Sequence, residues 1–146
     1  MTCVTTRPAD IRSGGSVIEV LVSPSQAYIS SLPEEERKAV RPLKASLLID
    51  TGASCTMIDP RIIDQLDIRP HSVTSISTPS SASHQVPVYA VNIGIPGIMF
   101  NLPDVPVVSN TLAPQQIDGL LGRDILSQCL FIYNGKNGDF TIALAL

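Results

Sequence analysis

The stretch Leu47-Leu48-Ile49-Asp50-Thr51-Gly52-Ala53-Ser54 runs from three apolar residues directly into a carboxylate, a hydroxyl and a glycine. Consecutive apolar residues are typical of a buried strand. Such a strand rarely ends on an ionisable group, because an isolated buried charge is costly. Gly52 can turn sharply and leaves neighbouring backbone N–H groups accessible. The segment therefore predicts a carboxylate at the edge of a core, in a setting suited to acid–base chemistry.

The sequence Asp50-Thr51-Gly52-Ala53-Ser54 after an apolar strand resembles the catalytic loop of aspartic proteases. The chain has 146 residues and contains no second Asp-Thr/Ser-Gly, which is similar to the retropepsin branch of that family. In retropepsins each subunit of a homodimer contributes one aspartate. The resemblance implies a mostly β fold: a small closed β-barrel of the retropepsin type with one or two short helices and one domain per subunit.

A second motif, Leu120-Leu121-Gly122-Arg123-Asp124, resembles the hydrophobic-hydrophobic-Gly-Arg-Asp/Asn segment of retropepsins. In that family this strand crosses beneath the catalytic loop and enters a short helix, here about residues 123–128. Gly122 permits close backbone packing, and Arg123 can anchor carboxylates or carbonyls through its planar fork. We expect Gly122, Arg123 and Asp124 to support the loop. Viral relatives often place an acidic partner for this arginine where the chain has Ser54, so the partner of Arg123 stays open, with Asp124 a local candidate.

Two extended runs, residues 73–78 and 85–95, are separated by small polar residues. A hairpin at this distance after the aspartate is where retropepsins carry the flap that covers the bound peptide and excludes water. The resemblance implies substrate contacts at its tip, from Ser80, Ser81 and Ala82. The tip lacks the glycine found in many family members, and an ordinary surface hairpin is the alternative interpretation.

The composition indicates one mostly β domain. Short Val/Ile-rich runs are separated by turn residues, with 12 prolines in the chain. We expect a flexible tail over residues 1–15 and the protease-like domain over residues 16–146. Net charge is −3, so no basic face for nucleic acid is predicted. No apolar run is long enough to span a membrane and no secretory signal is evident, so a cytoplasmic location is expected.

Further elements follow from local patterns. Strands are expected at residues 17–22, 43–49 and 55–58, and Asp59-Pro60 predicts the start of a helix over residues 60–66. Residues 33–40 fit either a short acidic helix or a charged loop.

The chain ends on the apolar run Phe140 to Leu146, after an Asn-Gly turn that predicts a hairpin with residues 130–133. An exposed apolar edge strand invites pairing with another chain. Retropepsin dimers are held by terminal strands, so the resemblance points to the same conclusion. The alternative is a strand placed within the monomer's own sheet.

Paired carboxylates can share one proton, which allows one to activate water while the other protonates the scissile carbonyl. A symmetric dimer supplies such a pair from one gene. By resemblance, Asp50, Thr51 and Gly52 are the catalytic residues, and Ala53 and Ser54 border the substrate. The predicted function is an aspartic endopeptidase, active as a homodimer on peptide or protein substrates, with no metal or organic cofactor.

Other chemistries fit the sequence less well. His71 and His84 are isolated among polar turn residues, and no zinc, serine-hydrolase or phosphate-loop motif is present. Cys3, Cys55 and Cys129 are widely spaced and fit free thiols. Cys55 fits a small core residue, or else a redox-sensitive thiol. The alternatives to a protease are a catalytically weak or inactive dimerisation or peptide-binding domain, and a structural domain cut from a larger polyprotein.

Overall fold

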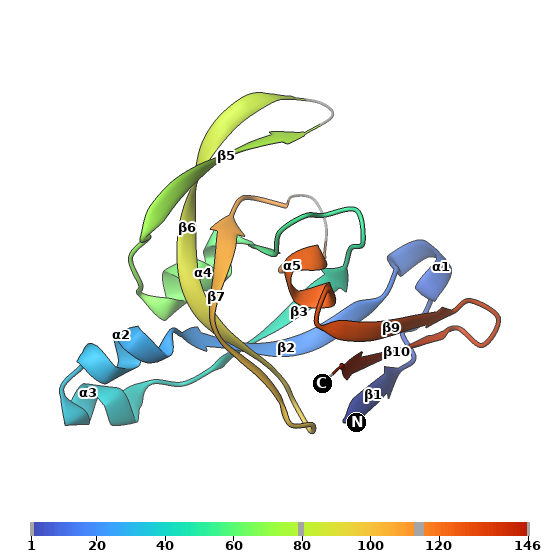
Figure 1. Cartoon of the computed structure of the whole chain (residues 1–146), viewed down its shortest axis with the longest axis horizontal. Helices are drawn as coiled ribbons and strands as arrows, with labels where there is room; N and C mark the ends of the chain where they lie inside the picture. The colour runs from blue at the N-terminus through green and yellow to red at the C-terminus, as the bar shows by residue number, and fades with distance from the viewer. Residues whose placement is uncertain (1, 79–80, 113–115, 146) are drawn as a thin grey trace.

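The computed structural model describes residues 2–78, 81–112 and 116–145. Strands dominate these residues, and the described part of the chain contains five short helices among them (Figure 1). The elements in chain order are β1 (Cys3–Thr6), α1 (Ile11–Gly14), β2 (Val17–Pro24), α2 (Gln26–Ser31), α3 (Glu34–Ala39), β3 (Leu43–Ile49), β4 (Met57–Ile58), α4 (Pro60–Leu66), β5 (Ser72–Thr78), β6 (Ser81–Ile95), β7 (Phe100–Ser109), β8 (Gly119–Leu121), α5 (Arg123–Leu126), β9 (Cys129–Asn134) and β10 (Asp139–Leu144).

Seven strands form the main sheet, in the order β2-β3-β8-β4-β7-β6-β5. A further pairing of β2 with β6 joins the two sides, so that six of these strands close into a ring. The long strand β6 makes this possible, because it pairs with β5 up to Val88 and with β2 from Val91 to Gly94. The mostly β fold predicted from the sequence is confirmed.

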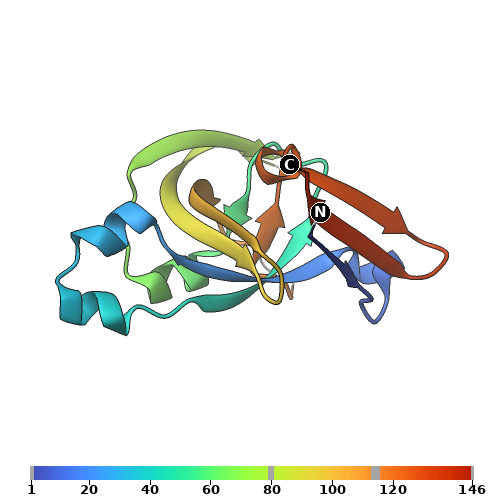
Figure 2. The same ribbon diagram turned by 60° about the horizontal axis from the view of Figure 1, so that its bottom comes forward.

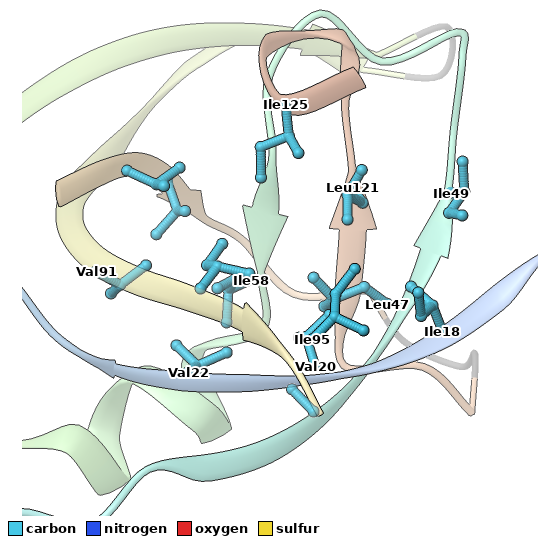
Figure 3. Packing of buried hydrophobic residues seen from close by; sticks show 14 of the residues in the cluster. Ile18, Val20, Val22, Leu47, Ile49, Ile58, Val91, Ile95, Leu121 and Ile125 are labelled. Atoms are coloured by element: carbon cyan, nitrogen blue, oxygen red, sulfur yellow. The ribbon is translucent and has the colours of Figure 1, made fainter. Parts of the chain in front are cut away.

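The core lies inside this ring and is aliphatic (Figure 3). In β2 every second residue is buried, with Ile18, Val20 and Val22 turned inward, as a strand with one core face requires. Leu47 and Ile49 continue this pattern in β3. Burying a side chain of this size contributes about 1.5–3 kcal/mol, so the ring is stabilised chiefly by its aliphatic interior.

The first 15 residues differ from the predicted flexible tail. Residues 3–6 form β1, which pairs with β10, and Ile11 is buried in the core. The polar composition hid this arrangement, since only Ile11 and Val4 supply the apolar contacts. Asp10 caps α1 by accepting the N–H groups of Arg12 and Ser13.

The C-terminal strand also differs from the leading prediction. Strand β10 lies between β1 and β9 in a separate three-stranded sheet, so both of its edges are paired. Phe140 and Ile142 are fully buried against the core. The apolar closing run is therefore explained by burial within the monomer, which was the alternative interpretation.

The helices at residues 34–39, 60–66 and 123–126 occupy predicted places, whereas α1 and α2 were not predicted. Ser25 caps α2 by accepting the N–H of Tyr28. None of the helices in the described residues is long and apolar enough to cross a membrane.

Gly119 provides a test of the packing between β8 and its neighbours. A Cβ there would overlap the Met57 carbonyl oxygen and lie 2.7 Å from Leu47 Cδ2. We expect Gly119→Ala to lower the free energy of unfolding by about 1–3 kcal/mol, the usual cost of overpacking. Gly14→Ala, where a Cβ meets nothing within 4 Å, is the matched control. Urea denaturation measures both, and equal stabilities would contradict the proposed crowding.

Asp59 gives the fold a pH dependence. Burial of this carboxylate opposes its ionisation, but hydrogen bonds from Arg61 and the N–H of Leu112, together with the charge of Arg61, outweigh burial and lower the pKa of Asp59 below its ordinary value of 3.8. A lowered folded-state pKa stabilises the protein above 3.8, and that contribution is lost as the pH falls through the folded-state pKa. We therefore expect the stability difference between wild type and Asp59→Asn to shrink below pH 3.8 in urea titrations. A difference that grows there would reverse the assigned sign.

Candidate active site

Asp50 directly follows β3, where the strand emerges from the core. Its N–H donates to the carbonyl of Leu121 at 3.0 Å, which extends the parallel pairing of β3 with β8 by one residue. Leu121 and Ile49 are buried on either side of this bond, whereas Asp50 is half-buried. The sequence prediction of a carboxylate at the edge of a core thus matches its position in the structure.

The loop after Asp50 turns back on the carboxylate. Gly52 N–H donates to Asp50 Oδ1 at 2.8 Å, and Ala53 N–H donates to the Asp50 carbonyl at 3.2 Å. A Cβ on Gly52 would lie 3.1 Å from the same Oδ1. Thr51 and Gly52 are exposed. The turn therefore fixes the carboxylate from one side, while Thr51 and Gly52 remain accessible from outside the chain.

Arg123 holds this loop at two points. Its Nη1 donates to the Thr51 carbonyl at 2.9 Å, and its backbone N–H donates to the Ala53 carbonyl at 2.9 Å. Within the described part of the chain, Arg123 forms no ion pair with a carboxylate. Its partner, left open by the sequence, is thus the loop backbone, and Asp124 does not fill that role.

Asp124 instead binds Thr56 on the far side of the loop. Asp124 Oδ1 accepts the Thr56 hydroxyl at 2.8 Å, and Oδ2 accepts the Thr56 N–H at 2.9 Å. The Thr56 oxygen in turn accepts the N–H of Gly122 at 3.1 Å. A Cβ on Gly122 would come within 2.6 Å of the Cys55 carbonyl group, so only glycine allows these two segments to approach. Gly122, Arg123 and Asp124 thus all meet the two ends of the loop.

Thr56 is the supporting residue that the sequence analysis missed. It was assigned to a strand over residues 55–58 without a role of its own, whereas β4 contains only Met57 and Ile58. Its side chain is fully buried. A buried hydroxyl needs hydrogen-bond partners, so the position of Thr56 among small residues after the Asp50 loop was an available signal.

A cleft of about 890 Å³ lies between the loop and the β5–β6 hairpin. Strand β5 forms one wall through residues 72–77, and Val88, Pro106 and Val108 contribute apolar surface. The described residues that line it are Gly52, Ala53, Ser54, Cys55, Met57, His71, Ser72, Val73, Thr74, Ser75, Ile76, Ser77, Val88, Pro106, Val108 and Asp124. The loop and the hairpin therefore share one cavity, although they are distant in sequence.

The predicted substrate-binding residues divide into two groups. Ala53 and Ser54 line the cleft. Ser80 lies outside the described residues, whereas Ser81 and Ala82 belong to β6, which begins earlier than predicted. Ser81 pairs with Thr78 through the backbone, and Ala82 is exposed and does not border the cleft. The hairpin is therefore longer than expected.

Cys55 lines the cleft from the loop that precedes β4, not from a strand as predicted. Burial, reinforced by the charge of Asp124, raises the pKa of the Cys55 thiol. A raised pKa leaves little nucleophilic thiolate at neutral pH. His71 also borders the cleft but is exposed, and His84 is exposed on β6. Among the described residues no group of three or more His, Cys, Asp or Glu side chains could hold a metal ion.

A single Asp-Thr-Gly loop, braced by a Gly-Arg-Asp segment beneath a long hairpin, defines a retropepsin-like fold. The chain belongs to the aspartyl protease family, whose model matches residues 40–125. That range begins before β3 and ends in α5, so it covers the loop, the hairpin and the bracing segment.

One solved structure supports this fold. The chain is similar to a retropepsin-like aspartic protease from Rickettsia conorii, with a TM-score of 0.61, 15% identity, and coverage of 97% of this chain and 92% of that chain. It also resembles the retroviral protease-like domain of Ddi1 from Leishmania major, with a TM-score of 0.46, 11% identity and 88% of each chain covered. A search of curated proteins returned no match.

The buried hydroxyl of Thr56 can be tested by substitution. Thr56→Val keeps the shape but leaves Gly122 N–H without its acceptor and removes a donor to Asp124. We expect a loss of about 1–3 kcal/mol in the free energy of unfolding, the cost of unsatisfied buried polar groups. Thr56→Ser keeps the hydroxyl and is the control. Chemical denaturation of the pair measures the difference, and a valine variant as stable as the serine variant would rule out the assigned role.

Proposed function

We propose that this protein is an aspartic endopeptidase that acts as a homodimer, with Asp50 of each chain forming the catalytic pair. The observation that carries the proposal is the position of Asp50. Its carboxylate is held by Gly52 N–H at the end of a buried strand, on a loop that lines a large cleft. Family membership and the retropepsin-like fold support the same reaction class.

A second chain is required by the chemistry. The sequence contains one Asp-Thr-Gly, so one chain supplies one catalytic carboxylate. Two carboxylates a few ångströms apart cannot both ionise easily, and they therefore share a proton.

In the proposed reaction, a water molecule lies between the two carboxylates. The ionised member removes a proton from this water, whose oxygen attacks the scissile carbonyl carbon. The protonated member donates its proton to the carbonyl oxygen, which gives a neutral gem-diol. In the collapse of the gem-diol, the carboxyl group that is now protonated gives its proton to the leaving nitrogen, and the ionised carboxylate takes a proton from one gem-diol hydroxyl, which becomes the product carbonyl as the C–N bond breaks. One water is consumed for each bond cut, and the pair returns to its starting protonation state.

The remaining site residues have supporting roles in this scheme. Thr51 is exposed, so its hydroxyl is available to bond across the dimer. The Gly52 backbone holds the carboxylate, and Ala53 and Ser54 border the bound peptide. The β5–β6 hairpin covers the peptide from the opposite wall of the cleft. An extended peptide fits a cleft with one strand along its length.

The substitution Asp50→Asn tests hydrolysis. It keeps the size and the Gly52 contact but removes one acid–base group from each chain. We expect cleavage of a denatured protein mixture at mildly acidic pH to fall by about 100-fold or more, as general acid–base groups contribute at least this much.

Asp64→Asn, the same change at an exposed position of α4, is the matched control and should cleave like wild type. Equal cleavage by wild type and Asp50→Asn would refute the proposal. Peptide binding without any cleavage by wild type would instead support the alternative predicted from the sequence, a peptide-binding or dimerisation domain.

A further inference from the structure

The proposed catalytic pair needs a surface that brings two chains together. The strand pairing limits which strand edges can form this surface. The C-terminal strand β10 is hydrogen-bonded to β1 on one side and β9 on the other. Its backbone groups therefore have no free edge for a second chain. Within the described residues, the unpaired edges of this three-stranded sheet are those of β1 and β9.

We propose that β9, residues 129–134, is the dimer seam, and that it pairs antiparallel with β9 of a second copy around a two-fold axis. This inference rests on the proposed function, because the partner contributes the second Asp50. The result is a continuous six-stranded sheet in the order β1-β10-β9-β9-β10-β1. Such an interface is isologous, since the same strand faces itself.

The backbone of β9 has groups directed outward. Ala145 N–H donates to the Gln128 carbonyl at 2.8 Å, which makes these two residues a hydrogen-bonded pair. Hydrogen-bonded pairs alternate along an antiparallel ladder, so Leu130 and Ile132 also bond toward β10. The N–H and C=O groups of the odd-numbered residues Phe131 and Tyr133 then face the free edge, ready to bond to a second strand.

The side chains of β9 favour association with an apolar, uncharged partner. The strand Cys-Leu-Phe-Ile-Tyr-Asn carries no charge. Leu130, Ile132 and Tyr133 are 46%, 50% and 52% exposed, which is unusual for large apolar side chains. Natural edge strands are commonly protected by lysine, proline or a bulge, and β9 contains neither lysine nor proline. An identical uncharged strand meets no electrostatic repulsion here.

The competing edge, β1, is less suited to this role. It is four residues long and begins at the N-terminal end of the described chain. Its Thr5 hydroxyl bonds to Thr141 at 2.7 Å, and the following Arg7 pairs with Asp139 at 3.3 Å. These contacts direct β1 toward its own chain, and its apolar Val4 packs against the core.

Helix α5 connects the proposed seam to the catalytic loop. Helix α5 begins at Arg123, which holds the Thr51 and Ala53 carbonyls, and β9 begins three residues after α5 ends. Figure 2 shows β9 along the outer margin of its sheet, running away from α5. In each chain α5 lies between β9 and the Asp50 loop. Pairing of the two β9 strands would therefore position the two Asp50 loops relative to each other.

Charge substitutions at Ile132 test the seam. We expect wild type to sediment at twice the chain mass of 15.6 kDa, and Ile132→Glu and Ile132→Lys each to sediment as monomers. Like charges meeting across a two-fold axis should weaken the dimer by at least about 100-fold. Mixing the two variants places opposite charges together and should restore both the dimer and cleavage.

Met99→Glu is the matched control, because Met99 is 90% exposed on the turn between β6 and β7. It should remain dimeric. Circular dichroism shows whether each variant is folded. If Ile132→Glu does not fold, Leu130→Glu is tested in its place. A folded Ile132→Glu variant that stays dimeric, a mixture that stays monomeric, or a monomeric wild type would each overturn the seam.

These outcomes separate the seam from the proposed reaction. A dimer that depends on Ile132 but cleaves nothing would leave the seam intact and refute the peptidase. Cleavage that requires Asp50 but survives in folded Ile132→Glu would refute the seam and leave the peptidase intact.

Discussion

The structure depends on the passage of β8 between β3 and β4, with backbone against backbone. Gly119 and Gly122 leave no room for a side chain at either end of this short strand. Because β8 fits there, its Leu121 carbonyl can accept the N–H of Asp50, and the residues that follow it can reach the Asp50 loop. A wider spacing would separate the loop from Arg123 and Asp124 together. The position of the carboxylate thus depends on close backbone packing at these two glycines.

The bracing of the loop illustrates how far a resemblance carries. Asp50 and the Gly-Arg-Asp segment were found by their order and local chemistry, and the structure brings both together. The partners could not be found in this way. Arg123 binds a backbone carbonyl, which every residue possesses, and Thr56 is one of many hydroxyl-bearing residues in the sequence. Bonds to the backbone leave no signature in residue types.

Local patterns predicted the individual strands better than their pairing. A run of apolar or β-branched residues predicted β2, β3 and, with the Asn-Gly turn, the C-terminal hairpin, since such a run indicates a buried strand. It does not report which edge is paired. Strand β10 was therefore taken as exposed because it is apolar, although β1 covers it with a polar sequence. The same polarity made residues 1–15 resemble a tail. The pairing of a strand edge depends on residues far away in the sequence, so the local pattern of one strand does not predict it.

Leu121, Gly52 and Arg123 of the same chain hydrogen-bond to the Asp50 loop. In the proposed dimer these contacts would position each Asp50 loop without help from the partner. In the proposed dimer, the total cleavage rate would be proportional to the concentration of dimer. At low concentration it would therefore rise with the square of the total protein concentration. Dilution would inactivate such an enzyme by dissociating the dimer, without an inhibitor. A high local concentration of its chains would activate it by promoting dimer formation.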